Sequence, residues 1–220
     1  MNVLNKVESP HFSQKLTVRN IQDEDIDEII QIAKVGFGNP EIAFKREHYE
    51  SQIRIFPEGQ VCIEYDGKIL GSCSSLIVNF DKYGEDHSFE EISDKGFIRN
   101  HQKNGKNLYG IDVVVHPEYQ KMKIGRRLYE ARRQLCKKLN LKSILFGGRL
   151  PHYYKYADQL TVHEYVELVI NEKLYDPVLT FQLRNGFKLR KVMENYLPQD
   201  NASLKNATLM EWYNPDYTEK

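Results

Sequence analysis

The amino-acid sequence predicts a mixed α/β fold, with a central sheet of about seven strands and helices on both of its faces. Runs of β-forming residues alternate with amphipathic helical segments along the chain. Residues 113–115 are three consecutive valines, which is typical of a strand that is covered on both faces. Neither an internal repeat nor a change in composition marks a boundary, so we expect a single domain over residues 1–220.

In the first half of the chain, two helices separate one strand from a pair of strands. Acidic residues 23–25 precede an apolar pattern, and acidic side chains favour the positive end of a helix. Pro40 suits the first position of a second helix, and Asp66-Gly67 is a strong signal for a tight hairpin turn. The expected elements are a strand at 16–19, a helix from 23, a helix from 40 to 55, strands at 61–65 and 69–77, and a short helical piece at 89–92.

The second half of the chain centres on a long amphipathic helix, in which Leu128, Leu135 and Leu139 recur at helical spacing. Asp176 followed by Pro177 has the form of a helix N-cap with proline at the first position. The expected elements are a strand at 109–116, helices at 124–139, 161–171 and 177–185, and strands at 143–146, 187–192 and 208–213. Two long excursions, at about 79–107 and 149–176, are expected to shape a binding pocket.

Composition narrows the class of protein. Lys plus Arg and Asp plus Glu both total 31, so bulk electrostatics does not favour a nucleic-acid partner. Cys62, Cys73 and Cys136 form no disulfide or metal-ligand pattern, so we expect buried thiols and no metal site. Residues 1–10 are too polar for a signal peptide, and no run reaches the ~20 apolar residues of a membrane span. We therefore expect a soluble, cytoplasmic protein with no membrane partner.

The segment from Val113 to Leu128 carries the chemistry. A buried strand leads through a tight loop into the start of a helix, where unpaired backbone N–H groups and a partial positive charge suit a pyrophosphate. Gly125 would allow the phosphates to approach the backbone closely. Lys121 and Arg126 add positive charge nearby.

This segment resembles the acyl-CoA-binding motif of the GNAT N-acyltransferase superfamily, whose pattern is Gln/Arg-x-x-Gly-x-Gly/Ala. Gln120 and Gly125 match its ends, whereas Lys123 replaces its first glycine. Residues 185–187, Asn-Gly-Phe, resemble a late element of the same family. The chain also resembles the GNAT domain that is fused to carbon–nitrogen hydrolases in some bacteria.

The resemblance implies a GNAT-like sheet and transfer of an acetyl group from acetyl-CoA to an amine. The acceptor is a small-molecule, peptide or protein amine, and a homodimer is left open. Backbone groups of the central strand would pair with the pantetheine arm, and those of the loop would hold the pyrophosphate. The implied cofactor-binding residues are Val113, Val115, Gln120, Lys121, Lys123, Ile124, Gly125 and Arg126.

The residues that move protons are harder to assign. Many members of the family protonate the leaving thiolate from a tyrosine whose position is Gln182 here, and an amide cannot act as an acid. The substitutes that we consider first are Tyr153 and Tyr154, just beyond Gly147-Gly148. His152 and His116 are also expected near the cleft, and Asp112 and Tyr109 lie on the central strand. A β-bulge is expected near Asp112.

Two interpretations without catalysis remain, one for a basic helix face and one for the whole chain. Lys137-Lys138 and Arg132-Arg133 are expected to form a solvated helix face. The departures at Lys123 and Gln182 also fit a non-catalytic module that binds acyl-CoA or another protein, because they fall on the phosphate loop and on the usual acid.

Overall fold

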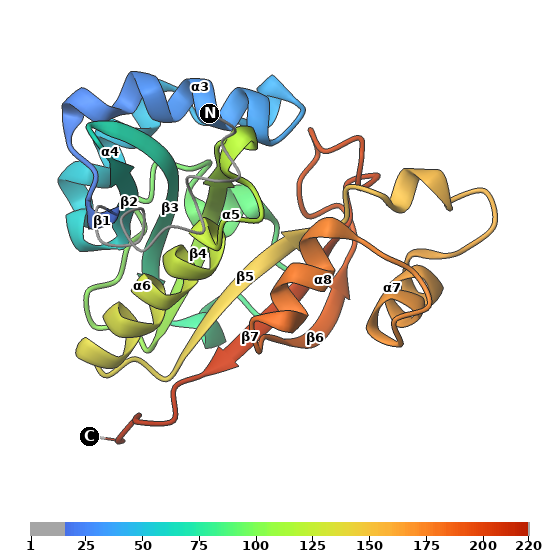
Figure 1. Ribbon diagram of the computed structural model, residues 1–220. Helices are drawn as coiled ribbons and strands as arrows, with labels where there is room; N and C mark the ends of the chain where they lie inside the picture. Colours follow the sequence, from blue (N-terminus) through green and yellow to red (C-terminus); the bar gives the residue numbers. More distant parts are fainter. Residues whose placement is uncertain (1–15, 220) are drawn as a thin grey trace.

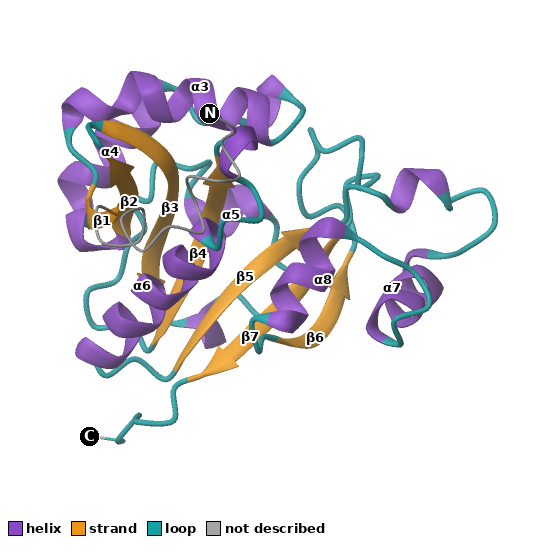
Figure 2. Cartoon of the chain, in the orientation of Figure 1, coloured by secondary structure: helices purple, strands orange, loops and turns teal. Residues whose placement is uncertain are grey.

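A computed structural model describes residues 16–219, which form one seven-stranded mixed sheet with helices on both faces (Figures 1 and 2). The strand order is β1-β2-β3-β4-β5-β7-β6. The strands are β1 Leu16–Asn20, β2 Gln60–Tyr65, β3 Lys68–Val78, β4 Asn107–Val115, β5 Ser143–Arg149, β6 Lys188–Met193 and β7 Ala207–Tyr213. The α-helices are α3 Ile26–Gly36, α4 Arg46–Ile55, α5 Phe89–Ser93, α6 Ile124–Lys138, α7 Val162–Ile170 and α8 Pro177–Arg184. The expected fold class is confirmed.

The centre of the sheet contains its single parallel pair, β4 and β5, and every other neighbouring pair is antiparallel. This parallel ladder is short, because it runs only from Asn107 opposite Ser143 to Gly110 opposite Phe146. Beyond that point the two strands diverge, and Figure 1 shows the resulting V between the green and yellow strands. We call this divergence of the two strand backbones, in the middle of the sheet, the opening.

Both faces of the sheet are covered by apolar side chains. In β2, Val61 and Ile63 belong to the cluster that packs against Leu128 of α6, whereas Cys62 between them belongs to the larger cluster of α3 and α4. Alternate side chains of a strand point to opposite faces, so this pattern places α6 on one face and α3 with α4 on the other. The three cysteines are buried and free, as expected.

The prediction of one continuous helix from Pro40 to Ile55 is wrong for its first turn. Pro40–Ile42 is a separate 3-10 turn, in which Asn39 Oδ1 accepts a hydrogen bond from Glu41 N, and α4 starts only at Arg46. Ala43 leaves the turn in an extended conformation, and this allows Phe44 to enter the core, where it is 8% exposed. Burial of the phenylalanine therefore outweighs continuation of the helix.

The strand expected to end at Phe146 instead continues through both glycines to Arg149. Gly147 and Gly148 pair with Leu209 and Thr208 of β7, so the ladder is not interrupted there. These glycines provide space rather than a strand end, because each is covered by a side chain from another segment.

The solvated face expected for Arg132-Arg133 and Lys137-Lys138 is wrong at Arg132, whereas both lysines are exposed. Arg132 is only 2% exposed, and its guanidinium group donates to Ser75 Oγ at 3.0 Å, to Ser74 O at 2.7 Å and to Asp112 O. The register of β3 and β4 shifts at Ser74, which confirms the bulge expected near Asp112. The bulge exposes carbonyl groups that this buried arginine satisfies.

Several local predictions are confirmed. Asp66 and Gly67 both have positive φ in the β2–β3 turn, and Asp176 Oδ1 accepts hydrogen bonds from Val178 N and Leu179 N at the start of α8. Among residues 16–219, no helix combines the length and apolar character that a membrane span requires. The expectation about a signal peptide concerns residues 1–10, which lie outside the described residues.

Candidate active site

The opening between β4 and β5 leaves backbone groups of β4 available for a ligand. His116 N donates to Leu70 O of β3 at 2.8 Å. Backbone groups alternate between the two sides of a strand, so those of Val113 and Val115 point away from β3, toward the opening. The ladder with β5 ends at Gly110, and no described strand pairs with these two valines on that side. They are therefore placed to pair with an extended amide-containing ligand.

The loop between β4 and α6 presents the start of a helix at the same end of β4. A 3-10 turn, Pro117–Tyr119, follows the strand, and α6 starts at Ile124 with no side chain capping it. The first intrahelical bond joins Arg127 N to Lys123 O at 3.1 Å. The N–H groups of residues 124–126 precede that bond, which is the arrangement found at helix N-termini that bind anions.

Lys123 does not close this loop. Its φ is 62°, in the left-handed region that glycine adopts readily. The residue therefore takes the conformation for which a glycine at this motif position is suited, at a cost of roughly 1–2 kcal/mol for a side chain that carries a Cβ. The Lys121, Lys123 and Arg126 side chains are exposed, so their charges face solvent around the loop.

Gly125 has a packing role in addition to the phosphate role suggested by its motif. A Cβ at this position would lie 2.9 Å from Cζ of Phe181 on α8. Phe181 also stacks on Tyr129 of α6, with ring centroids 5.1 Å apart. The absent side chain therefore allows α6 and α8 to approach each other beside the opening.

Gln182 supplies a buried acceptor without a partner. The residue is 4% exposed, and its Oε1 has no hydrogen-bond partner among the described residues. Its amide lies over Gly148 of β5, where a Cβ would come within 2.3 Å of Oε1. An unsatisfied buried carbonyl oxygen costs about 1–3 kcal/mol, and a ligand N–H in the opening would remove that cost. The site thus fits the amide-bearing pantetheine arm of coenzyme A.

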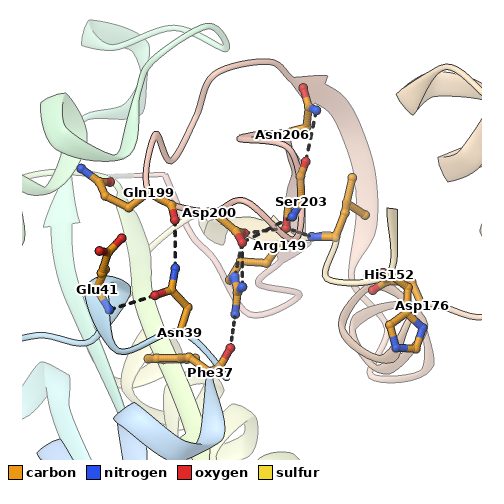
Figure 3. Close-up of polar contacts among 11 residues, drawn as sticks. Phe37, Asn39, Glu41, Arg149, His152, Asp176, Gln199, Asp200, Ser203 and Asn206 are labelled. Atoms are coloured by element: carbon orange, nitrogen blue, oxygen red, sulfur yellow. Dashed lines mark hydrogen bonds and ion pairs between the residues drawn. The ribbon is translucent and has the colours of Figure 1, made fainter. Parts of the chain in front are cut away.

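Arg149, at the end of β5, ties two connections together (Figure 3). It donates to both carboxylate oxygens of Asp200 at 2.7 Å and to Phe37 O at 3.2 Å. Asn39 Nδ2 donates to Gln199 O at 3.0 Å, which adds a second link between the α3–α4 and β6–β7 connections. Asp200 is 1% exposed. Burial alone would raise its pKa, but Arg149 and Ser203 outweigh that effect and hold the pKa below its usual value.

The predicted proton-transfer residues do not form a single cluster. His152 Nδ1 lies 3.4 Å from Tyr175 O, and His152 N donates to Asp176, so this residue contacts the α7–α8 connection (Figure 3). The Tyr153 hydroxyl donates to Leu160 O at 3.2 Å, within the excursion itself. Tyr154 is 53% exposed. Their catalytic roles stay predictions.

Asp112 lies on a different element and has different partners. Its Oδ1 accepts from Ser74 N at 2.8 Å, and its Oδ2 accepts from the Tyr49 hydroxyl of α4 at 3.4 Å. Burial raises the pKa of Asp112 to about 6, although Arg132 and the Ser74 hydrogen bonds act in the opposite direction. A carboxyl group with a pKa near neutrality can exchange protons at physiological pH.

Sequence reasoning missed a buried chain of hydroxyl and imidazole groups beside the opening. Nε2 of His87 lies 2.8 Å from the Tyr109 hydroxyl, which lies 3.0 Å from the Tyr196 hydroxyl. The three residues come from an excursion, from β4 and from the β6–β7 connection. The sequence suggested only Tyr109, from its location on the central strand, because sequence spacing does not relate the other two.

Described residues 16–219 contain no group of three or more His, Cys, Asp and Glu side chains arranged to hold a metal ion. The geometry instead combines a splayed parallel strand pair, a helix N-terminus and an unpartnered amide. Comparison with known proteins agrees with this combination, because residues 26–153 match the family model described as Acetyltransferase (GNAT) family. The chain belongs to the GNAT family of acetyltransferases. Membership confirms the expected family and leaves the acceptor unidentified.

Two relatives from Bacillus subtilis (strain 168) are similar over nearly the whole chain. Probable hydrolase YhcX is 54% identical over 212 residues, which are 96% of this chain and 41% of YhcX. Uncharacterized N-acetyltransferase YkwB is 39% identical over 207 residues, which are 93% of this chain and 91% of YkwB. The chain thus spans less than half of the first relative and most of the second.

Solved structures of this GNAT chain's fold include two proteins with TM-scores above 0.75. The loading GNATL domain of CurA from Lyngbya majuscula has a TM-score of 0.79 at 21% identity, covering 90% of this chain and 97% of that one. The GphF GNAT-like decarboxylase, in complex with isobutyryl-CoA, has a TM-score of 0.77 at 17% identity, with coverages of 90% and 98%. YncA from Salmonella typhimurium, with its cofactor acetyl-CoA, has a TM-score of 0.52 at 15% identity, with coverages of 93% and 97%.

Proposed function

We propose that this GNAT protein transfers an acetyl group to a primary amine whose nitrogen enters the opening between β4 and β5. The observation that carries the proposal is the coincidence of three features at the opening: unpaired β4 backbone groups, the uncapped start of α6 and the unpartnered Oε1 of Gln182. The β4 groups and Gln182 complement the pantetheine arm of acetyl-CoA, and the start of α6 complements its pyrophosphate. The cofactor supplies an acetyl group activated as a thioester.

In this proposal, the chain holds the cofactor along its length. Backbone groups of Val113 and Val115 pair with the pantetheine arm, and Gln182 Oε1 accepts a hydrogen bond from one of its amide N–H groups. The N–H groups of residues 124–126 hold the pyrophosphate, and Lys121 with Gln120 lines the loop beside it. Gln182 orients the arm and takes no part in acid catalysis, since an amide has no proton to give at neutral pH.

The acceptor reaches the opening past the two connections that Arg149 joins. Their hydrogen bonds make a fixed rim, because Arg149 and Asp200 are both largely buried and fully paired. A fixed rim favours an acceptor that presents its amine on a slender stem, such as a polyamine, a lysine side chain or a free amino terminus. We therefore propose a primary amine of this kind, from a soluble, cytoplasmic pool, as the acceptor class.

The proposal is tested by measuring acetyl-CoA binding and turnover with the same protein. Saturation at a hundredfold excess over Kd should raise the melting temperature by about 5–10 °C for a chain of this size. Release of the CoA thiol should then require an added amine, tested with spermidine, a lysine-containing peptide and a peptide with a free amino terminus. The charge-reversal variant Arg126→Glu should weaken binding about tenfold or more, whereas Lys138→Glu at the other end of α6 should not.

A second candidate function is decarboxylation of a carboxyacyl-CoA. It is favoured by the TM-score of 0.77 to the GphF GNAT-like decarboxylase and by the lack of an acid at Gln182. Malonyl-CoA is the simplest probe. Carbon dioxide release without an amine would support this candidate, whereas binding of acetyl-CoA without turnover of either probe would favour the non-catalytic module and sink the transferase proposal.

A further inference from the structure

A hydrogen-bonded chain of three buried side chains leads away from the opening. His87, Tyr109 and Tyr196 are 4%, 0% and 3% exposed. His87 Nδ1 lies 2.7 Å from Gly84 O, and the remaining links are 2.8 Å from His87 Nε2 to the Tyr109 hydroxyl and 3.0 Å from there to the Tyr196 hydroxyl. Three polar groups packed in an apolar core need a reason beyond packing, because phenylalanine would fill the tyrosine sites without a polar group to satisfy.

The geometry fixes the direction of this chain. Gly84 O can only accept a hydrogen bond, so His87 Nδ1 carries a hydrogen and donates it. In a neutral imidazole, Nε2 is then the acceptor, and it takes the Tyr109 hydroxyl hydrogen. The Tyr109 oxygen is thereby left to accept from Tyr196. Both tyrosine hydroxyls therefore donate toward His87, which is the orientation that carries a proton inward.

Tyr196 is the end of the chain at the opening. Gly147 is the first residue of β5 beyond the last pair with β4, and a Cβ on Gly147 would lie 2.7 Å from the Tyr196 hydroxyl oxygen. The absence of a side chain at this glycine is thus what lets the Tyr196 hydroxyl reach the point where the strands part.

We propose that Tyr196, Tyr109 and His87 form a relay that removes the proton from the acceptor nitrogen during acetyl transfer. The inference rests on the proposed transferase function. Tyr196 contacts the nitrogen and is the catalytic residue, whereas Tyr109 and His87 act through it. Burial keeps His87 neutral and lowers its pKa, so Nε2 is free to accept at neutral pH.

The proposed step balances. Transfer forms the amide C–N bond and breaks the thioester C–S bond. The nitrogen passes one proton to the Tyr196 oxygen as Tyr196 passes its own to Tyr109, and Tyr109 passes its own to His87 Nε2. The departing thiolate takes up one proton from solvent, and His87 later returns one proton to solvent. The protons therefore balance, and no oxidant or reductant is needed.

Two carboxylates and three aromatic rings surround His87. Asp86 on its own segment and Glu91 on α5 favour its protonation, and Asp86 is itself paired with Lys191 of β6. The other faces of the ring meet Phe80, Tyr109 and Tyr196 edge-on. Because burial outweighs the two carboxylates, the relay should fail only when the pH falls below the ordinary histidine value of about 6.5.

The test is kcat against pH for the wild type and for Tyr196→Phe, Tyr109→Phe, His87→Gln and the double phenylalanine variant, with the amine that works best in the panel above. Each single change should lower kcat by about 10²–10⁴-fold while leaving the Kd for acetyl-CoA unchanged. The double variant should be no slower than either single variant, because one broken relay cannot be broken again. His87→Gln should also lose the acidic limb that the wild type shows below pH 6.5.

Tyr83→Phe is the matched control. It removes a tyrosine hydroxyl that accepts from Asn100 in the same excursion, away from the opening, and kcat should not change. Urea unfolding of every variant separates lost folding from lost catalysis. Unchanged kcat in Tyr196→Phe, or multiplied losses in the double variant, would overturn the relay alone. A wild type that binds acetyl-CoA but releases no thiol with any amine would overturn the transferase proposal and the relay with it.

Discussion

The amide of Gln182 lies directly over Gly148, so closely that a Cβ on the glycine would come within 2.3 Å of Gln182 Oε1. The two residues belong to α8 and β5, which pack against each other on one face of the sheet. The side chain that stands where related enzymes carry an acid is therefore held over the opening by the lack of a side chain beneath it.

This contact predicts a coupling between the two positions. Gly148→Ala should lower the free energy of unfolding by about 1–3 kcal/mol, because the buried amide has to move. The same change in a Gln182→Ala background should cost less, by a coupling energy of about 0.5–3 kcal/mol. Urea unfolding of the four proteins measures this energy, and strictly additive costs would show that the contact is unimportant.

Arg149→Met should destabilise the protein by about 3–5 kcal/mol, because it leaves the carboxylate of Asp200 buried without its partner. Arg99→Met is the matched control, since the pair of Arg99 with Asp94 is exposed and should contribute at most about 1 kcal/mol. Equal losses in the two variants would contradict the structural role of Arg149.

The same pair predicts a pH dependence. The pKa of Asp200 is lowered in the folded state. The ionised carboxylate therefore contributes fully to the free energy of unfolding above the unfolded pKa of about 3.9, and this contribution is lost as the pH falls below that value. Asp200→Asn should therefore be less stable than the wild type at pH 7, and the gap should narrow toward pH 3. Urea midpoints at the two pH values measure the gap, and a constant gap would show that charge plays no part.

The sequence predicted the sheet, α6 and the cap of α8 because these depend on local patterns. The valines of β4 and the leucines of α6 repeat at the periods of a buried strand and an amphipathic helix, and Asp176 caps α8 within three residues. Such signals need no knowledge of distant segments.

The features that the sequence did not predict depend on contacts between distant segments. Arg132 looked solvated among its charged neighbours, and only the bulge in β4 explains its burial. Similarly, Tyr109 and Tyr196 are 87 positions apart in the sequence but share a hydrogen bond. No periodicity can reveal such a pair, which is why the sequence did not connect Tyr109 with Tyr196.

Asp112 should give the opposite pH dependence to Asp200. Its pKa is raised by burial from 3.8 to about 6, so the folded state binds the proton more tightly than the unfolded state. The free energy of unfolding of the wild type should therefore fall by about 2–3 kcal/mol from this group as the pH rises from about 4 to 6. Asp112→Asn cannot ionise, and its Oδ1 can still accept from Ser74 N. Urea unfolding at pH 4.5 and 7 should show the variant gaining on the wild type at the higher pH. Parallel curves would mean that Asp112 titrates normally.

Lys123→Gly should restore the glycine of the family motif without loss of stability. The substitution relieves the roughly 1–2 kcal/mol cost of a left-handed side-chain-bearing residue, and it adds about 0.5–1 kcal/mol of chain entropy to the unfolded state. We expect a net change between zero and about 1 kcal/mol of stabilisation. Glu130→Gly in the middle of α6 is the control and should cost about 1 kcal/mol, because φ there is already helical.

Acetyl-CoA titrations of Lys123→Gly should show a Kd within about threefold of the wild type, since the N–H groups that hold the pyrophosphate keep their positions and only one exposed charge is lost. A variant that folds less well than the wild type would show that Lys123 makes a contact that compensates for its backbone strain.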